Sequence, residues 1–289
     1  MNASLIITTY NQPEALGKVL SGLQHQTTLP DEILIADDGS TETTRAVVGQ
    51  WQMKLSIPVR HVWHEDKGFR RAAIANKAAA QARGNYLVFL DGDCVPHKQF
   101  IADHRAMAER GHWVQGRRCY VRKQFVKEFM PGKTPIFRWM LKGRIAFTSK
   151  ALRFPIPVVR RDQTQHAIMG CNMGFWRDNF MAVNGFDEAY CGWGCEDKDI
   201  ACRLYHFGLR KKLVKHRAII FHLDHPLASR EQLALNCKRL DETIHSKKIR
   251  CETGVSQYLC PSKFTPAPAA ILPEEFFAEP LEQPAALSA

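Results

Sequence analysis

Short apolar runs alternate with helical segments through the first third of the chain. Apolar residues at i, i+3, i+4 and i+7 follow Pro13, a polar segment covers 41–51, and an alanine-rich segment covers 69–83 before Gly84, a residue type that often ends a helix. Strands that alternate with helices form a mostly parallel sheet flanked by helices. The sequence therefore predicts an α/β fold, with strands at 3–9, 32–36, 57–63 and 86–90.

This regular pattern stops at about residue 110, and the chain divides there into two halves of one predicted domain. Residues 1–110 form the regular half, and residues 111–260 form a less regular one. Residues 261–289 are a tail with 6 Pro and 7 Ala in 29 residues and little apolar periodicity. A segment of this kind cannot bury enough apolar surface to fold, so we expect it to be disordered and dispensable for chemistry.

The ends of three predicted strands carry hydroxyl, amide and carboxylate groups, at 8–11 (TTYN), 37–40 (DDGS) and 91–93 (DGD). Ligands of open α/β sheets bind beyond the carboxyl ends of the strands. In an extended segment Asp91 and Asp93 would point the same way, and two such carboxylates suit Mg²⁺ or Mn²⁺ shared with substrate phosphates. Any one cluster alone could instead be a turn or a helix cap.

The net charge of +11 is concentrated in residues 117–161. This stretch holds 13 Lys and Arg and the single acid Glu128, so its net charge is 13 − 1 = +12, and it includes seven aromatic residues. Such a composition suits a polyanionic partner. The aromatic rings could stack on nucleic-acid bases or lie in a lipid headgroup layer. No nucleic-acid-binding motif is present, so an anionic membrane surface or anionic glycan is the favoured partner.

Several features indicate a cytoplasmic protein, bound at most peripherally to the inner face of a membrane. No apolar run is long enough to span a bilayer, and the N-terminus lacks the features of a signal peptide. The nine cysteines form no paired framework, which is typical of reduced thiols. Cys191, Cys195 and Cys202 lack a fourth ligand at zinc-binding spacing, so we interpret them as buried free thiols.

Eight short motifs occur along residues 2–230 in the order 6–11 (IITTYN), 37–40 (DDGS), 68–70 (GFR), 75–78 (ANKA), 91–93 (DGD), 170–175 (GCNMGF), 185–188 (GFDE) and 192–197 (GWGCED). Together they resemble the family 2 inverting glycosyltransferases, which have the GT-A (Rossmann-like) fold. The last motif is similar to the C-terminal motif of galactosyltransferases and chondroitin-polymerase-like enzymes. The combination in this order is far more specific than any single motif.

The resemblance implies that residues 1–110 bind a nucleotide-sugar, with uracil the usual base. Asp93 would be the direct ligand of Mn²⁺ or Mg²⁺, with Asp91 beside it. His222 would be a third ligand and His225 the alternative to it. The residues that the resemblance assigns to the UDP-sugar are Thr8, Tyr10, Asp37, Asp38, Lys67, Arg70 and Asp91.

The resemblance also implies that residues 111–260 bind the acceptor and supply the catalytic base. An inverting transfer needs a base to take the proton from the attacking hydroxyl. Asp197 is the expected base, and Glu196, Trp193 and Asn172 are the expected acceptor contacts. The alternative for the acidic pair is a structural one, because acids also favour a helix N-terminus.

The function that follows is transfer of a hexose or N-acetylhexosamine from a UDP-sugar to a hydroxyl of a glycan or glycolipid. Synthesis of lipopolysaccharide or another cell-surface polysaccharide is the expected setting. Two alternatives are a nucleic-acid-binding protein that uses residues 117–161 and a nucleotidyltransferase. The second would need a glycine-rich phosphate loop near the first strand, and residues 8–13 contain no glycine.

Overall fold

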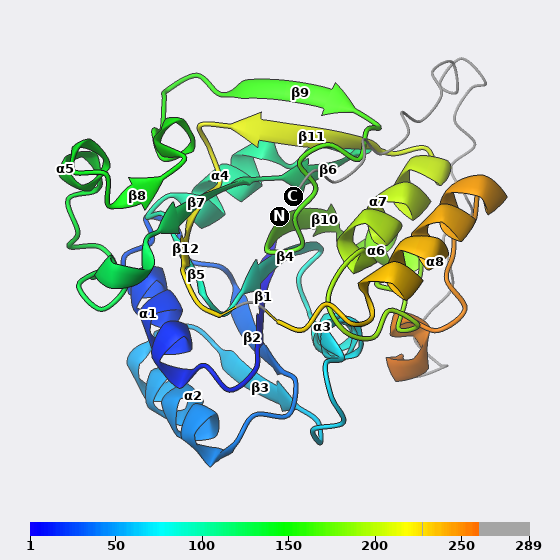
Figure 1. Cartoon of the computed structure of the whole chain (residues 1–289), viewed down its shortest axis with the longest axis horizontal. Helices are drawn as coiled ribbons and strands as arrows, with labels where there is room; N and C mark the ends of the chain where they lie inside the picture. Colours follow the sequence, from blue (N-terminus) through cyan, green and yellow to red (C-terminus); the bar gives the residue numbers. More distant parts are fainter. Residues whose placement is uncertain (227, 260–289) are drawn as a thin grey trace.

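The computed structural model describes residues 1–226 and 228–259, which form two β-sheets flanked by helices (Figure 1). Within these residues the larger sheet has eight strands in the order β3-β2-β1-β4-β10-β6-β11-β9, and the smaller has four in the order β5-β12-β7-β8. The larger sheet contains β1 (Ala3–Thr9), β2 (Glu32–Asp37), β3 (Val59–Trp63), β4 (Tyr86–Asp91), β6 (His112–Gln115), β9 (Val158–Asp162), β10 (Asn172–Trp176) and β11 (Arg210–Lys215). The smaller sheet contains β5 (Cys94–Pro96), β7 (Arg117–Val121), β8 (Ile145–Ala146) and β12 (Ile219–Leu223).

Helices pack on both faces of the larger sheet. Along β1, Leu5 and Ile7 face one apolar cluster and Ile6 faces the other, as alternation along a strand requires. Helices α1 and α2 contribute to the first cluster, and α3, α6 and α7 contribute to the second. The helices are α1 (Pro13–Gln24), α2 (Glu42–Lys54), α3 (Arg71–Gln81), α4 (Phe100–Met107), α5 (Ile136–Leu141), α6 (Arg177–Ala182), α7 (Glu196–His206) and α8 (Leu233–Ser246), with 3₁₀ turns at Lys123–Phe125, Thr148–Lys150 and Val255–Tyr258.

The predicted α/β fold is confirmed in its first half. Strands β3, β2, β1 and β4 are parallel neighbours, and the apolar runs of β2, β1 and β4 are buried on both faces, as central parallel strands require. Gly84 was expected to end the helix before it, but α3 ends at Gln81. Gly84 instead lies against β1, where a Cβ would come within 2.6 Å of Ser4 Oγ. Its role is therefore close backbone packing.

Strands from the second half of the chain extend the same sheet, because β10 pairs directly with β4 in the antiparallel sense. The predicted boundary near residue 110 therefore falls inside one continuous sheet, whereas the predicted tail, 261–289, lies outside the described residues. In the part of the chain that is described, none of the helices has the length and apolar character needed to cross a bilayer. The eight cysteines found there are free thiols.

Candidate functional site

The three polar clusters at the strand ends meet at one edge of the larger sheet. Thr8 is in register with Asp91 across β1 and β4, and Thr9 is in register with Asp37 across β1 and β2. The Thr8 hydroxyl donates a hydrogen bond of 2.8 Å to Asp91 Oδ1. Register between parallel strands thus brings together groups that lie far apart in the sequence.

Each aspartate after β2 contacts a histidine that the sequence did not single out. His61 Nε2 lies 2.8 Å from Asp37 Oδ2, and His64 Nε2 lies 2.6 Å from Asp38 Oδ1. Burial raises the pKa of Asp38, although His64 and the Arg70 backbone N–H oppose this shift. Asp37 is fully buried and also accepts a bond from the backbone of the following turn. Asp37 therefore shapes this turn from within the protein, while Asp38 links it to the start of α3.

Two of the residues predicted to contact the UDP-sugar lie on the exposed rim of this edge of the larger sheet. The Tyr10 ring is 46% exposed, and its hydroxyl donates a 2.8 Å bond to Asp66. Lys67 is exposed and pairs with Glu65 at 3.1 Å. The Arg70 side chain donates to the Glu65 carbonyl, so its charge turns towards this rim and not towards Asp91.

The chain passes from the larger sheet to the smaller one at Gly92 and Asp93. Strand β4 ends at Asp91 and β5 begins at Cys94, so Asp93 lies in a tight turn. The expectation of an extended segment from Asp91 to Asp93 is therefore wrong. A Cβ on Gly92 would come within 2.9 Å of the Thr8 carbonyl, so close packing on β1 favours glycine here.

Asp93, His222 and His225 form a group that could hold a metal ion, with one ligand atom from each residue and all three atoms within 4.8 Å of one another. Asp93 Oδ2 lies 2.8 Å from His225 Nε2 and 3.6 Å from His222 Nε2. His222 reaches this position because β12 pairs with β5 directly after the turn. Both histidines are therefore present, where the sequence treated them as alternatives. Asp91 is not a member of this group.

The charges of this group are interdependent. The contact with Asp93 raises the pKa of His225 to about 9, although burial opposes the rise. Burial lowers the pKa of His222, whose Nδ1 is buried without a hydrogen-bond partner among the described residues. Burial opposes the charge of Asp93, but the two histidines more than offset this and lower its pKa. One carboxylate with two imidazoles is a donor set compatible with Mn²⁺.

Arg71, at the start of α3, connects Asp91 to the second half of the site. Its Nη2 lies 2.7 Å from Asp91 Oδ1 and donates a 3.1 Å bond to the Gly170 carbonyl, and its Nη1 lies 3.8 Å from Glu196 Oε1. Burial disfavours its charge, but Asp91 and Glu196 together raise its pKa. Sequence reasoning missed Arg71, although the pair of arginines at the start of the 69–83 helix was visible.

Glu196 and Asp197 open α7 after a loop with left-handed backbone at Gly192, Gly194 and Cys195. Asp197 accepts bonds from the backbone N–H of Gly170 at 3.0 Å and from that of the residue after it at 2.8 Å. Burial raises the pKa of Asp197 against the opposing charge of Arg71. Burial and the neighbouring Asp197 raise the pKa of Glu196 to about 7.

The predicted acceptor contacts differ in their exposure. The Trp193 ring is 42% exposed, with the Arg230 guanidinium 5.1 Å from its centre. Asn172 is fully buried, and its amide bonds His104 at 3.0 Å and the carbonyls of Arg117 and Ala218 at 3.2 and 2.7 Å. Its polar atoms are thus used within the protein. The expectation that Asn172 contacts the acceptor is contradicted, and its role is to join the two sheets.

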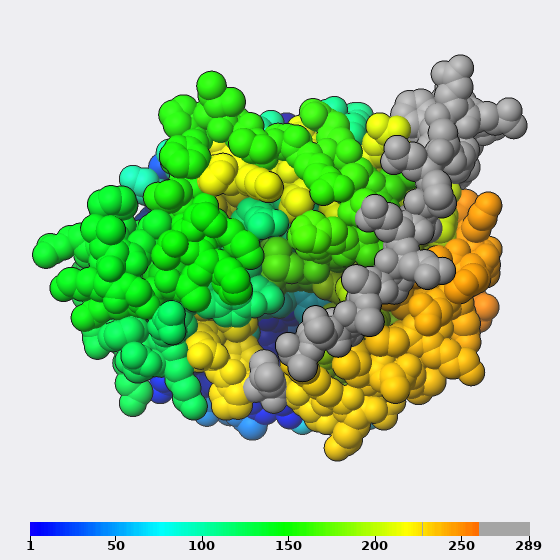
Figure 2. Space-filling view, turned by 45° about the horizontal axis from the view of Figure 1, so that its top comes forward, coloured from blue at the N-terminus to red at the C-terminus, as the bar shows by residue number. Residues whose placement is uncertain are grey.

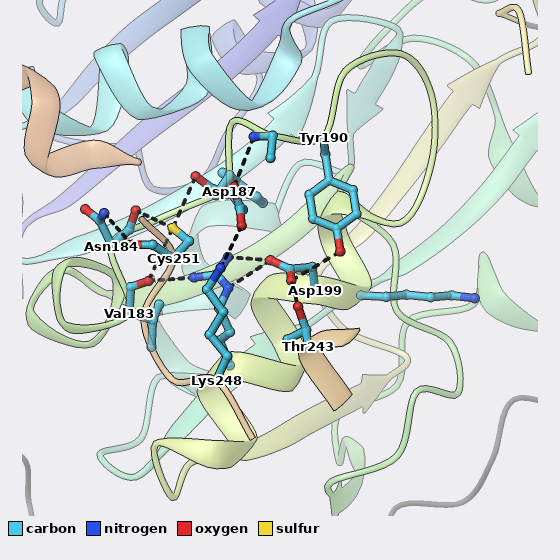
Figure 3. Close-up of polar contacts among 12 residues, drawn as sticks. Val183, Asn184, Asp187, Tyr190, Asp199, Thr243, Lys248 and Cys251 are labelled. Atoms are coloured by element: carbon cyan, nitrogen blue, oxygen red, sulfur yellow. Dashed lines mark hydrogen bonds and ion pairs between the residues drawn. The ribbon is translucent and has the colours of Figure 1, made fainter. Parts of the chain in front are cut away.

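A buried ion pair lies within α7, and Figure 3 shows the polar contacts around Asp199. The side chains of Asp199 and Arg203 are both fully buried, and Arg203 Nη2 lies 2.7 Å from Asp199 Oδ2. Thr243 of α8 donates a 2.8 Å bond to Asp199, and Arg203 donates to the Val183 carbonyl. The helix that begins with Glu196 and Asp197 is therefore fixed to α8 and to the segment after α6.

Comparison with protein families gives two matches. The model described as "Glycosyl transferase family 2" matches residues 4–183, and the model described as "N-terminal domain of galactosyltransferase" matches residues 153–226. Together these ranges contain the strand-end clusters, the acidic pair of α7 and His222 and His225.

Curated relatives and solved structures agree with these matches. Validoxylamine A glucosyltransferase of Streptomyces hygroscopicus subsp. limoneus is 32% identical over 229 residues, which cover 71% of this chain and 48% of the relative. Chondroitin synthase of Escherichia coli is 26% identical over 242 residues, which cover 77% of this chain and 35% of that protein. The chain thus spans about half the length of the first relative and about a third of the length of the second.

Two solved structures share the fold at low identity. Residues 1–349 of S. aureus TarS in complex with UDP match with a TM-score of 0.58 and 17% identity, and the match covers 89% of this chain and 68% of that one. The mannosyltransferase PcManGT of Pyrobaculum calidifontis, in complex with GDP-Man and Mn²⁺, matches with a TM-score of 0.54 and 20% identity, and covers 88% and 65%.

Proposed function

The chain belongs to glycosyl transferase family 2, and we propose from this membership and the site geometry that it is an inverting transferase of a hexose or N-acetylhexosamine. The donor would be a UDP-sugar, and the acceptor a hydroxyl of a glycan or glycolipid. One observation carries the proposal: Arg71 contacts Asp91, which lies beside the metal-ligand group, and also Glu196 of the acidic pair. Groups suited to a diphosphate and groups suited to a hydroxyl thus lie on either side of one guanidinium.

The donor would lie along the edge formed by β1, β2 and β4. Thr8, Asp38 and Asp91 supply hydroxyl and carboxylate groups there, and the exposed Tyr10 ring could contact a uracil base. The solved neighbours include TarS in complex with UDP and with UDP-GlcNAc, which supports a uridine donor. The exposed Lys67 and the guanidinium of Arg70 are proposed contacts of the diphosphate once it is bound.

Asp93, His222 and His225 are the residues that would hold Mn²⁺ or Mg²⁺, with Asp91 close by. The donor atoms of these three residues suit a divalent metal ion, because one carboxylate and two imidazoles converge within 4.8 Å. A bound divalent ion would neutralise charge on the diphosphate leaving group. The Mn²⁺ in the PcManGT complex supports the choice of ion.

Asp197 is the proposed base that accepts the proton of the attacking hydroxyl. Burial raises its pKa, which makes its carboxylate a stronger base, and Arg71 and two backbone N–H groups keep it in the charged form. Glu196 would bind acceptor hydroxyls, and the exposed Trp193 ring would stack on a sugar. The proton therefore moves from the acceptor oxygen to Asp197 as that oxygen forms the new glycosidic bond and the diphosphate leaves.

Synthesis of lipopolysaccharide or another cell-surface polysaccharide, at the cytoplasmic face of a membrane, is the proposed setting. The similarity to chondroitin synthase of Escherichia coli and the galactosyltransferase match support a polysaccharide product. The nucleotidyltransferase alternative is set aside by the family match.

A panel of UDP-sugars tests the proposal. Purified protein with Mn²⁺ should release UDP from one or two members of the panel, and excess EDTA should stop the release. Asp93→Asn should reduce UDP release at least about a hundredfold while the protein remains folded, because the charged ligand is lost. Full UDP release in EDTA would contradict the metal proposal, and no release from any UDP-sugar would contradict the donor.

A further inference from the structure

We propose that a surface centred on helix α5 docks the protein on an anionic membrane. Helix α5 lies in the connection between β7 and β8, at one end of the molecule and far from α8 (Figure 1). Figure 2 shows the green surface of this connection protruding from the same end. We define the α5 surface by seven residues: Lys127, Met130, Lys133, Phe137, Arg138, Leu141 and Lys142.

The α5 surface presents large apolar side chains to solvent. Leu141 is 75% exposed, Phe137 is 64% exposed and Met130 is 56% exposed. Phe137 and Leu141 are four residues apart on the helix, so they lie on one face. Exposed apolar side chains that share one face, as Phe137 and Leu141 do, mark an interaction site more often than isolated ones do.

The same surface is basic, and its charge is not neutralised. Lys127, Lys133, Arg138 and Lys142 are exposed, and within residues 1–226 and 228–259 none of them pairs with an acid. Glu128, the single acid of the 117–161 stretch, is engaged by Arg144 at 2.6 Å. Other basic residues of that stretch are neutralised, because Arg153, Arg160 and Arg161 pair with Asp103, Asp162 and Glu109. Four of the basic residues of that stretch that have no acidic partner in the described part of the chain therefore belong to the α5 surface.

Helix α5 is anchored from beneath, so its outer face is presented on a fixed support. Trp139 and Phe129 are buried in the first apolar cluster, and the Arg144 guanidinium lies 5.1 Å from the Trp139 ring. These two aromatic rings, which the sequence suggested for a surface, belong to the core. The exposed set that remains includes aliphatic Leu141 and Met130, which cannot stack on bases, and this favours lipid over nucleic acid.

The small sheet connects the α5 surface to the candidate metal group. Tyr120 of β7 is in register with Ala146 of β8 on one side and with His222 of β12 on the other. Docking through α5 would hold this sheet, and the site with it, near the bilayer. The placement of the site near the bilayer rests on the proposed function, because it explains how the enzyme would reach a lipid-linked acceptor. Docking of the α5 surface on a membrane does not depend on that function.

Vesicle co-sedimentation of the full chain tests the proposal. The protein should bind phosphatidylglycerol-containing vesicles at low salt, release from them at high salt, and bind pure phosphatidylcholine vesicles weakly. Lys133→Gln/Arg138→Gln/Lys142→Gln should weaken binding by about a hundredfold at low salt, because each basic residue near the surface contributes to the attraction. Phe137→Ser/Leu141→Ser should weaken vesicle binding by about tenfold. The binding that remains should be more sensitive to salt than that of the wild type.

Met53→Ser/Leu235→Ser is the matched control, because these residues are 83% and 46% exposed on α2 and α8. It should bind vesicles like the wild type, and circular dichroism should confirm that all variants fold. Unchanged binding in both α5 variants, equal binding to neutral vesicles, or preferential binding to oligonucleotides would overturn the proposal. Vesicle binding without UDP release would retain the docking surface and reject only the proposed enzyme function.

Discussion

Arg71 joins the two halves of the candidate site through its contacts with Asp91 and Glu196. Sequence reasoning chose Arg70 because it completes a family motif, but Arg70 lies just before α3 with a non-helical backbone, whereas Arg71 is the first residue of the helix. Arg70 therefore bonds the Glu65 carbonyl, while Arg71 turns inwards to Asp91. His61 and His64 were missed for a similar reason, since nothing in a short apolar strand indicates which side chains will meet a buried aspartate.

Substitution of Arg71 tests its role in holding the two halves of the site. Arg71→Met would leave Asp91 and Glu196 without their shared cation, and we expect both a loss of about 3–5 kcal/mol in unfolding free energy and at least a tenfold loss of UDP release. Arg71→Lys keeps the charge but not the forked contact, so it should recover most of the stability and only part of the activity. Thermal unfolding and UDP release measure the two effects separately. Wild-type behaviour of Arg71→Met would contradict this role.

At the level of elements, the parallel strands and the apolar run that forms β12 were predictable, whereas the shortest strands of the small sheet were not. Runs such as β1 and β4 are apolar along their whole length because both faces are buried, which gives a strong signal. Strands β5 and β8 have only three and two residues, too few for a recognisable period. The tight turn at Asp93 was missed as a result.

The buried ion pair within α7 should control the stability of that helix. Arg203→Met would leave Asp199 as an uncompensated buried charge, so unfolding free energy should fall by about 3–5 kcal/mol. Lys238→Met on the exposed face of α8 should change it by less than about 0.5 kcal/mol. Denaturant titration compares the two variants with the wild type. A loss in Arg203→Met no larger than that of the control would show that the pair does not fix α7.

At the scale of the whole molecule, two buried histidines should lower the unfolding free energy of the protein in mild acid. Burial lowers the pKa of His97 and His104 to about 4, whereas an unfolded histidine has a pKa of about 6.5. Unfolded chains therefore take up these protons first as pH falls. The contribution of each histidine, up to about 3 kcal/mol, is complete above about pH 6.5 and is lost between about pH 6.5 and 4.

Comparison of pH profiles identifies the histidine contribution. His104→Gln can keep a donor to Asn172 but cannot titrate, so its unfolding free energy should vary less between pH 7 and 5 than that of the wild type. The exposed His245→Gln should follow the wild-type profile. Parallel profiles for His104→Gln and the wild type would contradict the prediction.

The candidate site is also a property of the whole molecule, because its members come from distant segments. Asp93 meets His222 only because β12 pairs with β5, and Asp197 meets Gly170 because the start of α7 lies against the segment that precedes β10. The resemblance to a family identified Asp93, His222 and Asp197 by motif, without their geometry. It could not indicate that His225 joins His222, or that Asn172 is buried between the sheets.

Asp197→Asn gives the most direct test of transfer chemistry at this site. The variant and the wild type are compared in two measurements with Mn²⁺ present, the affinity for UDP by calorimetry and the rate of UDP release from the preferred UDP-sugar. Because Asp197 acts on the acceptor hydroxyl, UDP affinity should stay within about twofold while UDP release falls by about 10²–10⁴-fold. Glu196→Gln should have a smaller effect on the rate. UDP release at the wild-type rate in Asp197→Asn, with UDP affinity unchanged, would contradict the assignment of the base and the mechanism built on it.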